Sequence, residues 1–99
     1  MASHAAITLA PRIVTRKWAP IAFSRVPGQL TAVVLGAHEC ETLTADAADA
    51  ILQQVARRGA RLVVVGASPE VSTRLGYAAA KNKVTLVERD IDAEDLLRS

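Results

Sequence analysis

The densest group of chemically active side chains runs from His38 to Glu41, where a histidine and a cysteine alternate with two glutamates. A histidine near a cysteine can supply a general base and a thiolate nucleophile. The carboxylates on either side of Cys40 disfavour the thiolate, because negative neighbours raise the pKa of a thiol. One histidine and one cysteine are also too few ligands for zinc. We therefore expect a loop histidine, a small buried thiol, no catalytic residue and no metal. An enzyme that uses His38 and Cys40 stays as an alternative.

A second candidate site is the loop from Gly66 to Val71, between an expected strand and an expected helix. Dinucleotide-binding folds hold a pyrophosphate at this position, and an acid about 20 residues later binds the ribose. Glu88 and Asp90 stand there, but Gly66 is the only glycine of the G-x-G-x-x-G pattern and Ser68 takes the second place. The loop and the strand after it resemble those of potassium-channel regulatory (RCK) domains. A small ligand or nucleotide held by Gly66, Ser68, Glu88 and Asp90 is the alternative function.

Two hydroxyl side chains, Thr42 and Thr44, precede the first strongly periodic helix. Either can cap the helix by accepting a hydrogen bond from its first turn. Either is also a candidate phosphorylation site, where a phosphate would add about two negative charges. Since Glu41 stands beside them, that charge would release a partner rather than recruit one.

Composition limits the chain to one small globular domain. Ninety-nine residues are too few for two cores, and 51% hydrophobic with 22% charged residues is typical of a folded protein. Trp18, Phe23 and Tyr77 are the only aromatic residues, which argues against base stacking on nucleic acid. No apolar run reaches the roughly 18 residues of a membrane span, and a single cysteine excludes an internal disulfide. We expect no nucleic-acid partner, no membrane insertion and no cofactor.

The first third of the chain has the composition of β structure. Alternating apolar residues predict strands over residues 5–9, 13–18 and 21–26, and the Pro27-Gly28 turn predicts a hairpin between residues 21–26 and 30–35. Residues 1–38 contain no acid, which is also typical of an organellar transit segment. We expect a cytoplasmic protein, with an organelle matrix as the alternative.

From Thr44 onward, helical and strand patterns alternate. Apolar spacing predicts a helix from Thr44 to Arg58 that Gly59 ends, and a second helix that begins after Ser68. Strands are predicted over residues 61–66 and 84–88, with a last helix over 93–98 capped by Asp92. The fold class is thus α/β: a single mixed sheet with N-terminal antiparallel strands, a C-terminal β-α-β-α-β-α parallel part, and helices packed on the sheet. Residues 1–99 form one domain, β-rich over 1–35 and alternating over 36–99.

The second half resembles the STAS domain, the fold of bacterial anti-sigma factor antagonists and of the cytoplasmic tails of sulfate transporters. The resemblance covers about residues 48–99, and its motif is the run from Arg61 to Val71, similar to the R-L-x-L-x-G-x-S-P-E-V pattern of that family. The sequence departs from the family at its D-S-S-G segment, where Glu41-Thr42-Leu43-Thr44 stands. It also has no evident helix ahead of residues 30–35, where the family has one.

The resemblance implies a non-enzymatic interaction domain with a regulator or a kinase as its protein partner. Thr42 matches the serine that the family phosphorylates, and Thr44 is the second candidate. We expect the partner to contact the loops at the carboxyl ends of the strands and the exposed face of the helix from Thr44. The residues expected to bind it are Glu41, Ala45, Gln54 and Ser68. A homodimer through the edge of the sheet is also plausible on the small size of the core.

Overall fold

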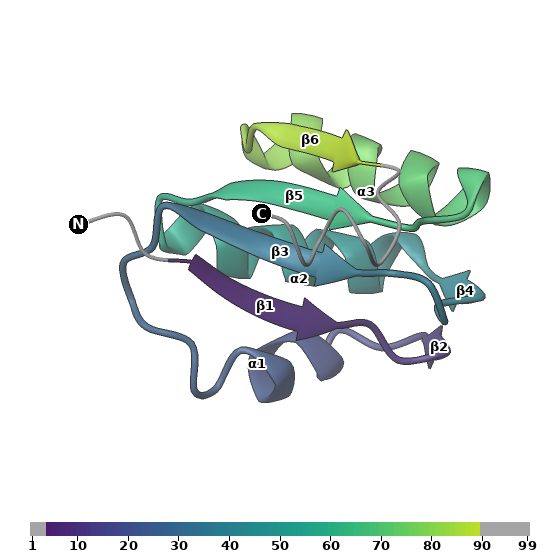
Figure 1. Cartoon of the computed structure of the whole chain (residues 1–99). Coiled ribbons are helices and arrows are strands. Elements are labelled where there is room, and N and C mark those ends of the chain that lie inside the picture. Colours follow the sequence, from purple (N-terminus) through teal and green to yellow (C-terminus); the bar gives the residue numbers. More distant parts are fainter. Residues whose placement is uncertain (1–3, 90–99) are drawn as a thin grey trace.

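Four short apolar runs form one parallel sheet in the order β1-β3-β5-β6 (Figure 1). The computed structural model describes residues 4–89. The strands are β1 (His4–Thr8), β3 (Ala32–Gly36), β5 (Arg61–Val65) and β6 (Leu86–Arg89). Each pairs in parallel with the strand that precedes it in this order.

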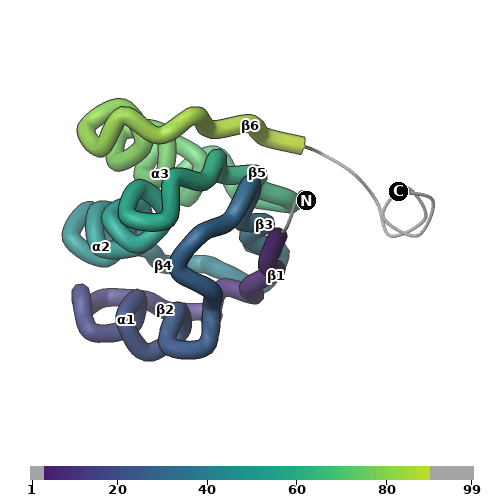
Figure 2. Tube along the Cα trace, turned by 90° about the vertical axis from the view of Figure 1, so that its left-hand side faces the viewer, coloured from purple at the N-terminus to yellow at the C-terminus, as the bar shows by residue number. Residues whose placement is uncertain are grey.

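The helices lie together on one face of this sheet (Figure 2). They are α1 (Trp18–Ala22), α2 (Ala45–Arg57) and α3 (Pro69–Asn82), and each connects two neighbouring strands. Crossovers of one hand between strands that follow one another across a sheet put every helix on the same side. The described part of the chain therefore has two layers, with the core between the helices and one face of the sheet.

The core is built from aliphatic side chains at alternate strand positions. Successive residues of a strand point to opposite faces, and the helix-facing residues of the two central strands, β3 and β5, are fully buried. Val33, Leu35, Leu62 and Val64 are at most 1% exposed. They pack with the apolar sides of the helices, which contribute Ile51, Leu52 and Val55 from α2 and Val71 and Leu75 from α3.

Side-chain caps set the starts of both long helices, as the sequence predicts. The Thr44 hydroxyl accepts a hydrogen bond of 3.2 Å from the backbone N–H of Ala47, so Thr44 rather than Thr42 is the cap of α2. The Ser68 hydroxyl likewise caps α3, because it accepts a hydrogen bond of 3.3 Å from the backbone N–H of Val71. Gly59 follows α2 with φ of 66°, a left-handed conformation that glycine adopts at low cost. These two helices and the parallel pairing of β3, β5 and β6 are confirmed.

The prediction of antiparallel N-terminal strands is wrong. β1 pairs in parallel with β3, and no antiparallel pair occurs among the described strands. Residues 21–26, the predicted partner of a hairpin, form the end of α1 and a turn instead. Ala19 and Phe23 are each 1% exposed while Ile21 is 72% exposed. A spacing of four between buried residues is typical of a helical turn. In so short a segment, buried residues four apart with an exposed residue midway also fit the alternation of a strand.

The middle predicted strand is reduced to β2 (Arg12–Ile13), which pairs in parallel with β4 (Thr42–Leu43) in a separate small sheet. This pairing places the segment before α1 against the segment before α2. The predicted helix over residues 93–98, with its cap at Asp92, lies outside the described residues. Within residues 4–89, no helix has both the length and the apolar character needed to cross a membrane.

Candidate functional site

At the carboxyl ends of the strands, His38 covers Gly66. Gly66 has φ of 75°, and a Cβ added there would collide with the His38 imidazole. The imidazole thus occupies the space directly above the first glycine of the candidate nucleotide loop. His38 itself is an exposed residue. The two segments that the sequence suggests for chemistry are therefore in contact, and the contact is a packing contact.

The Cys40 thiol is buried, with 3% of the residue exposed. Its Sγ lies 3.7 Å from the carbonyl oxygen of Thr42, to which it donates a weak hydrogen bond. Burial raises the pKa of the thiol, and the contact with the Thr42 backbone offsets this in part. Neighbouring His38 and Glu39 are exposed, so the cluster that looks dense in sequence is divided between core and surface. A thiol in this setting is a packing group and a poor nucleophile.

The alternative ligand site is only partly assembled. Gly66 and Glu88 line the same cleft of about 280 Å³, together with Arg89. Glu88 accepts a hydrogen bond from the Ser72 hydroxyl of α3, so its carboxylate faces the helix. Ser68 is occupied as the cap of α3. Asp90 lies outside the described residues.

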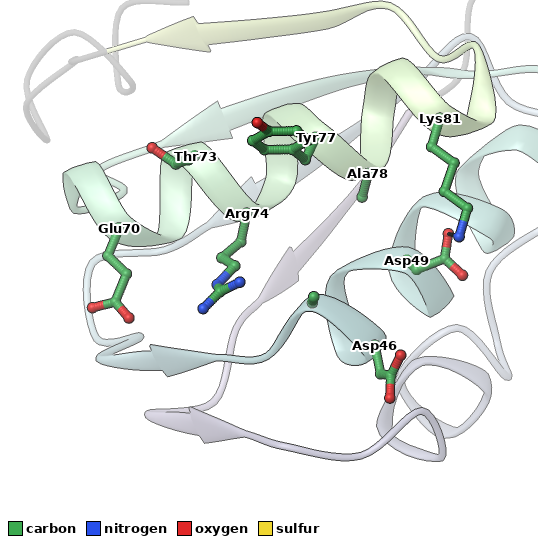
Figure 3. A pocket seen from close by; sticks show the side chains of 9 residues that line it. Asp46, Asp49, Glu70, Thr73, Arg74, Tyr77, Ala78 and Lys81 are labelled. Atoms are coloured by element: carbon green, nitrogen blue, oxygen red, sulfur yellow. Dashed lines mark ion pairs between the residues drawn. The ribbon is translucent and has the colours of Figure 1, made fainter.

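A larger groove of about 610 Å³ runs between α2 and α3 on the outer side of the helix layer (Figure 3). Its α3 side carries Glu70, Thr73, Arg74, Tyr77, Ala78 and Lys81, and its α2 side carries Ala45, Asp46 and Asp49. Tyr77 is 79% exposed and is the most exposed large side chain with hydrophobic character in the described part of the chain. None of the candidate sites expected from the sequence is this groove. The available signal was an aromatic residue outside the apolar face of its helix.

The charges in the groove differ in how they are satisfied. The carboxylate of Asp49 accepts hydrogen bonds from Asn82 at 2.9 Å, Arg16 at 3.0 Å and Gln53 at 3.2 Å. Lys81 lies 3.8 Å from it. The Asn82 hydrogen bond is the largest cause of a lowered pKa at Asp49; burial opposes it, and Arg16 and Lys81 add to it. Asp49 is thus a structural link across the floor of the groove.

The remaining charged side chains of the groove are unpaired. Asp46, Glu70 and Arg74 make no side-chain hydrogen bond or ion pair within residues 4–89. Figure 3 shows Glu70 and Arg74 projecting from one side of α3, while Asp46 projects from α2 on the side away from α3. Acids lie near the start of each helix, at Asp46 and Glu70, and Lys81 lies in the last turn of α3. Both signs of charge therefore occur among the residues that line the groove with Tyr77.

The predicted partner-binding residues are spread over two ends of the helix layer. Ala45 lines the groove, and Glu41 and Ser68 are exposed near the starts of the helices. Gln54 lies further along α2, where its side-chain oxygen accepts a hydrogen bond of 2.8 Å from Arg58. Arg58 also donates to the carbonyls of the turn after α1, so Gln54 helps to hold that turn.

The phosphorylation candidates differ in access. Thr42 is exposed on β4, and Thr44 is half-buried with its hydroxyl engaged as the helix cap. Among the residues the structure describes, no group of three or more histidine, cysteine, aspartate or glutamate side chains could hold a metal ion.

Comparisons of the chain with family models, with curated proteins and with solved structures found no match.

Proposed function

We propose that this protein is a STAS-like regulatory domain without enzymatic activity, and that it binds another protein at the groove between α2 and α3. The ring of Tyr77, 79% exposed in a groove that unpaired charges also line, is the observation that carries this proposal. Tyrosine is enriched at the energetic centres of protein interfaces, because its ring buries a large area while its hydroxyl keeps a hydrogen bond.

The fold supports the STAS resemblance at one point where the sequence departs from the family, the helix ahead of residues 30–35. The sequence shows no evident helix ahead of residues 30–35, but the structure has α1 between β1 and β3. Thr44 caps α2, so the segment that matches the family's D-S-S-G run stands at the start of a helix that lines the groove.

Regulation by phosphorylation fits this arrangement best at Thr42, the exposed hydroxyl. A phosphate adds about two negative charges, and Glu41 and Asp46 are already acidic neighbours in the chain. The added charge would repel a partner that carries acids at this end of the groove. A regulatory domain of this kind acts on proteins in the cytoplasm, the location we propose, with an organelle matrix as the alternative.

Site-specific photocrosslinking tests the proposed groove. A photoreactive phenylalanine analogue replaces Tyr77 in one variant and Arg57 in the control, since Arg57 is an exposed residue of α2 that does not line the groove. We expect the probe at position 77 to capture a distinct protein in cells. With that protein purified, Tyr77→Ala should weaken binding at least about tenfold, as at a typical interface hot spot, and Arg57→Ala should not.

Two results would contradict the proposal. Equal capture from positions 77 and 57 would mean that the groove has no specific partner. Capture of this same chain alone would replace the regulatory partner with a homodimer.

The alternative, a nucleotide or small-ligand module at Gly66 and Glu88, has less support because His38 covers Gly66 and Ser72 engages Glu88. A thermal-shift screen against mono- and dinucleotides separates the two. A shift that is lost in Glu88→Gln would favour the ligand module.

A further inference from the structure

One face of the main sheet has no helix over it among the described residues (Figure 2). Its central row is apolar: Ala6, Val34, Val63 and Val87 are in register across the sheet. Alternation puts these residues on the face opposite the buried row of Val33 and Leu62. Ala6 is exposed and the three valines are half-buried. A continuous apolar row of this kind marks a contact surface.

The charges around this row have one sign. Arg61 and Arg89 are on the same face as Val63 and Val87 by strand alternation, and both are exposed. The only acid in the described strands of this sheet is Glu88, which is turned to the helix face and bonded to Ser72. The open face is therefore apolar with a basic rim. A second copy of the chain would bring like charges together, so an acidic apolar segment fits better.

The chain supplies such a segment directly after β6. Residues 90–99 contain four acids and one arginine, with Ile91, Leu96 and Leu97 as large apolar residues. Ala93, Leu96 and Leu97 have the i, i+3, i+4 spacing that gives one apolar stripe on a helix. Both the charge and the apolar pattern of this segment complement those of the open face.

We propose that the open face of the sheet is the docking surface for residues 90–99, with Leu96 and Leu97 against Val34 and Val63. The acids then lie near Arg61 and Arg89. The reach is sufficient: three linking residues extend about 10 Å, which is about the distance between packed layers, and neighbouring strands are about 4.8 Å apart. This contact is separate from the groove between α2 and α3, and it leaves that groove free for a partner.

Thiol accessibility in the full-length chain tests the contact. In a Cys40→Ala background, Val63→Cys places one thiol on the open face, and its alkylation rate is measured with iodoacetamide. We expect the rate to rise about tenfold or more when Leu96→Asp and Leu97→Asp are added, because a protected group reacts only when its cover opens. Arg57→Cys is the control on the helix layer, and its rate should not respond to the two aspartates.

A second probe, Val34→Cys, covers the case in which the cysteine at position 63 disturbs folding. High salt should speed alkylation of either probe in the otherwise unchanged chain, since screening weakens the contact with Arg61 and Arg89. Equal rates with and without the two aspartates at both probes would overturn the proposal. Protection that grows with protein concentration would also overturn it, because the cover would then be a second copy.

Discussion

The side-chain amide of Asn82 donates a hydrogen bond of 2.9 Å to the carboxylate of Asp49, which joins the last turn of α3 to the first half of α2. The same amide donates to the carbonyl of Ala78 at 2.8 Å, so both of its hydrogens are used. Arg16, in the segment before α1, binds the other carboxylate oxygen at 3.0 Å. One nearly buried acid therefore fixes the relative position of three parts of the helix layer, and with it the width of the groove.

Removing the Asp49 carboxylate should destabilise the protein more than removing an exposed acid. Asp49→Ala removes the carboxylate that accepts hydrogen bonds from Asn82, Arg16 and Gln53, at an expected cost of about 1–3 kcal/mol in the free energy of unfolding. Asp46→Ala, on the same helix but exposed, should change it by less than about 0.5 kcal/mol. Urea denaturation of the two variants measures the difference. Equal stabilities of the two variants would show that the hydrogen bonds of Asp49 make no net contribution to the free energy of unfolding.

The lowered pKa of Asp49 gives this contribution a pH dependence. A depressed carboxyl pKa stabilises the folded state above the unfolded value, about 3.9, and the gain is lost as pH falls through the folded value. We expect the stability difference between the parent protein and Asp49→Asn to be constant near pH 7 and to shrink below about pH 4. Urea titrations at several pH values test this. A difference that is unchanged at pH 3 would contradict it.

The contact between His38 and Gly66 predicts how the loop after β5 responds to substitution. Gly66→Ala places a methyl group against the imidazole and forces an L-residue to φ of 75°. A left-handed backbone costs about 1–2 kcal/mol for a residue with a Cβ, and the collision adds to this. Gly66→Ala with His38→Ala should therefore recover part of the loss and leave the backbone cost. Thermal denaturation of the single and double variants checks this. Full recovery of stability in the double variant would refute the backbone cost, and no recovery would refute the collision with His38.

The sequence identified the features that depend on local chemistry. Thr44, Gly59, Ser68 and Pro69 each stand where a helix cap or stop requires that residue type, and the parallel strands between them follow from short crossovers. It failed where two periodicities overlap in a short window. Ala19 and Phe23 are spaced for one helical turn, but five residues of α1 are too few to separate that pattern from strand alternation.

The candidate site was harder to predict because it depends on tertiary contacts. Sequence proximity suggested that His38 and Cys40 act together, whereas burial of Cys40 and exposure of His38 separate them. The groove brings together Asp46 and Tyr77, which are 31 positions apart in the chain. No pattern in one helix alone reveals which of its polar faces will lie beside another helix.

Arg58 explains how α1 and the turn after it are held to α2. Its guanidinium donates to the carbonyls of Pro27 at 2.9 Å and Phe23 at 3.1 Å, and lies 5.2 Å from the centre of the Phe23 ring. A lysine has one point charge and no planar fork, so it cannot make these contacts together. Arg58→Lys should therefore loosen residues 18–27 while leaving the sheet intact.

Hydrogen–deuterium exchange of the full chain measures this loosening directly. We expect amides in α1 and its following turn, such as those of Phe23 and Val26, to exchange about tenfold faster or more in Arg58→Lys, since local opening is set by the contacts that close it. Arg57→Lys is the matched control, because Arg57 is the exposed neighbour in the same helix turn. Faster exchange spread evenly over β3 and β5 would instead show that Arg58 stabilises the whole fold, and the assignment of a local role would be wrong.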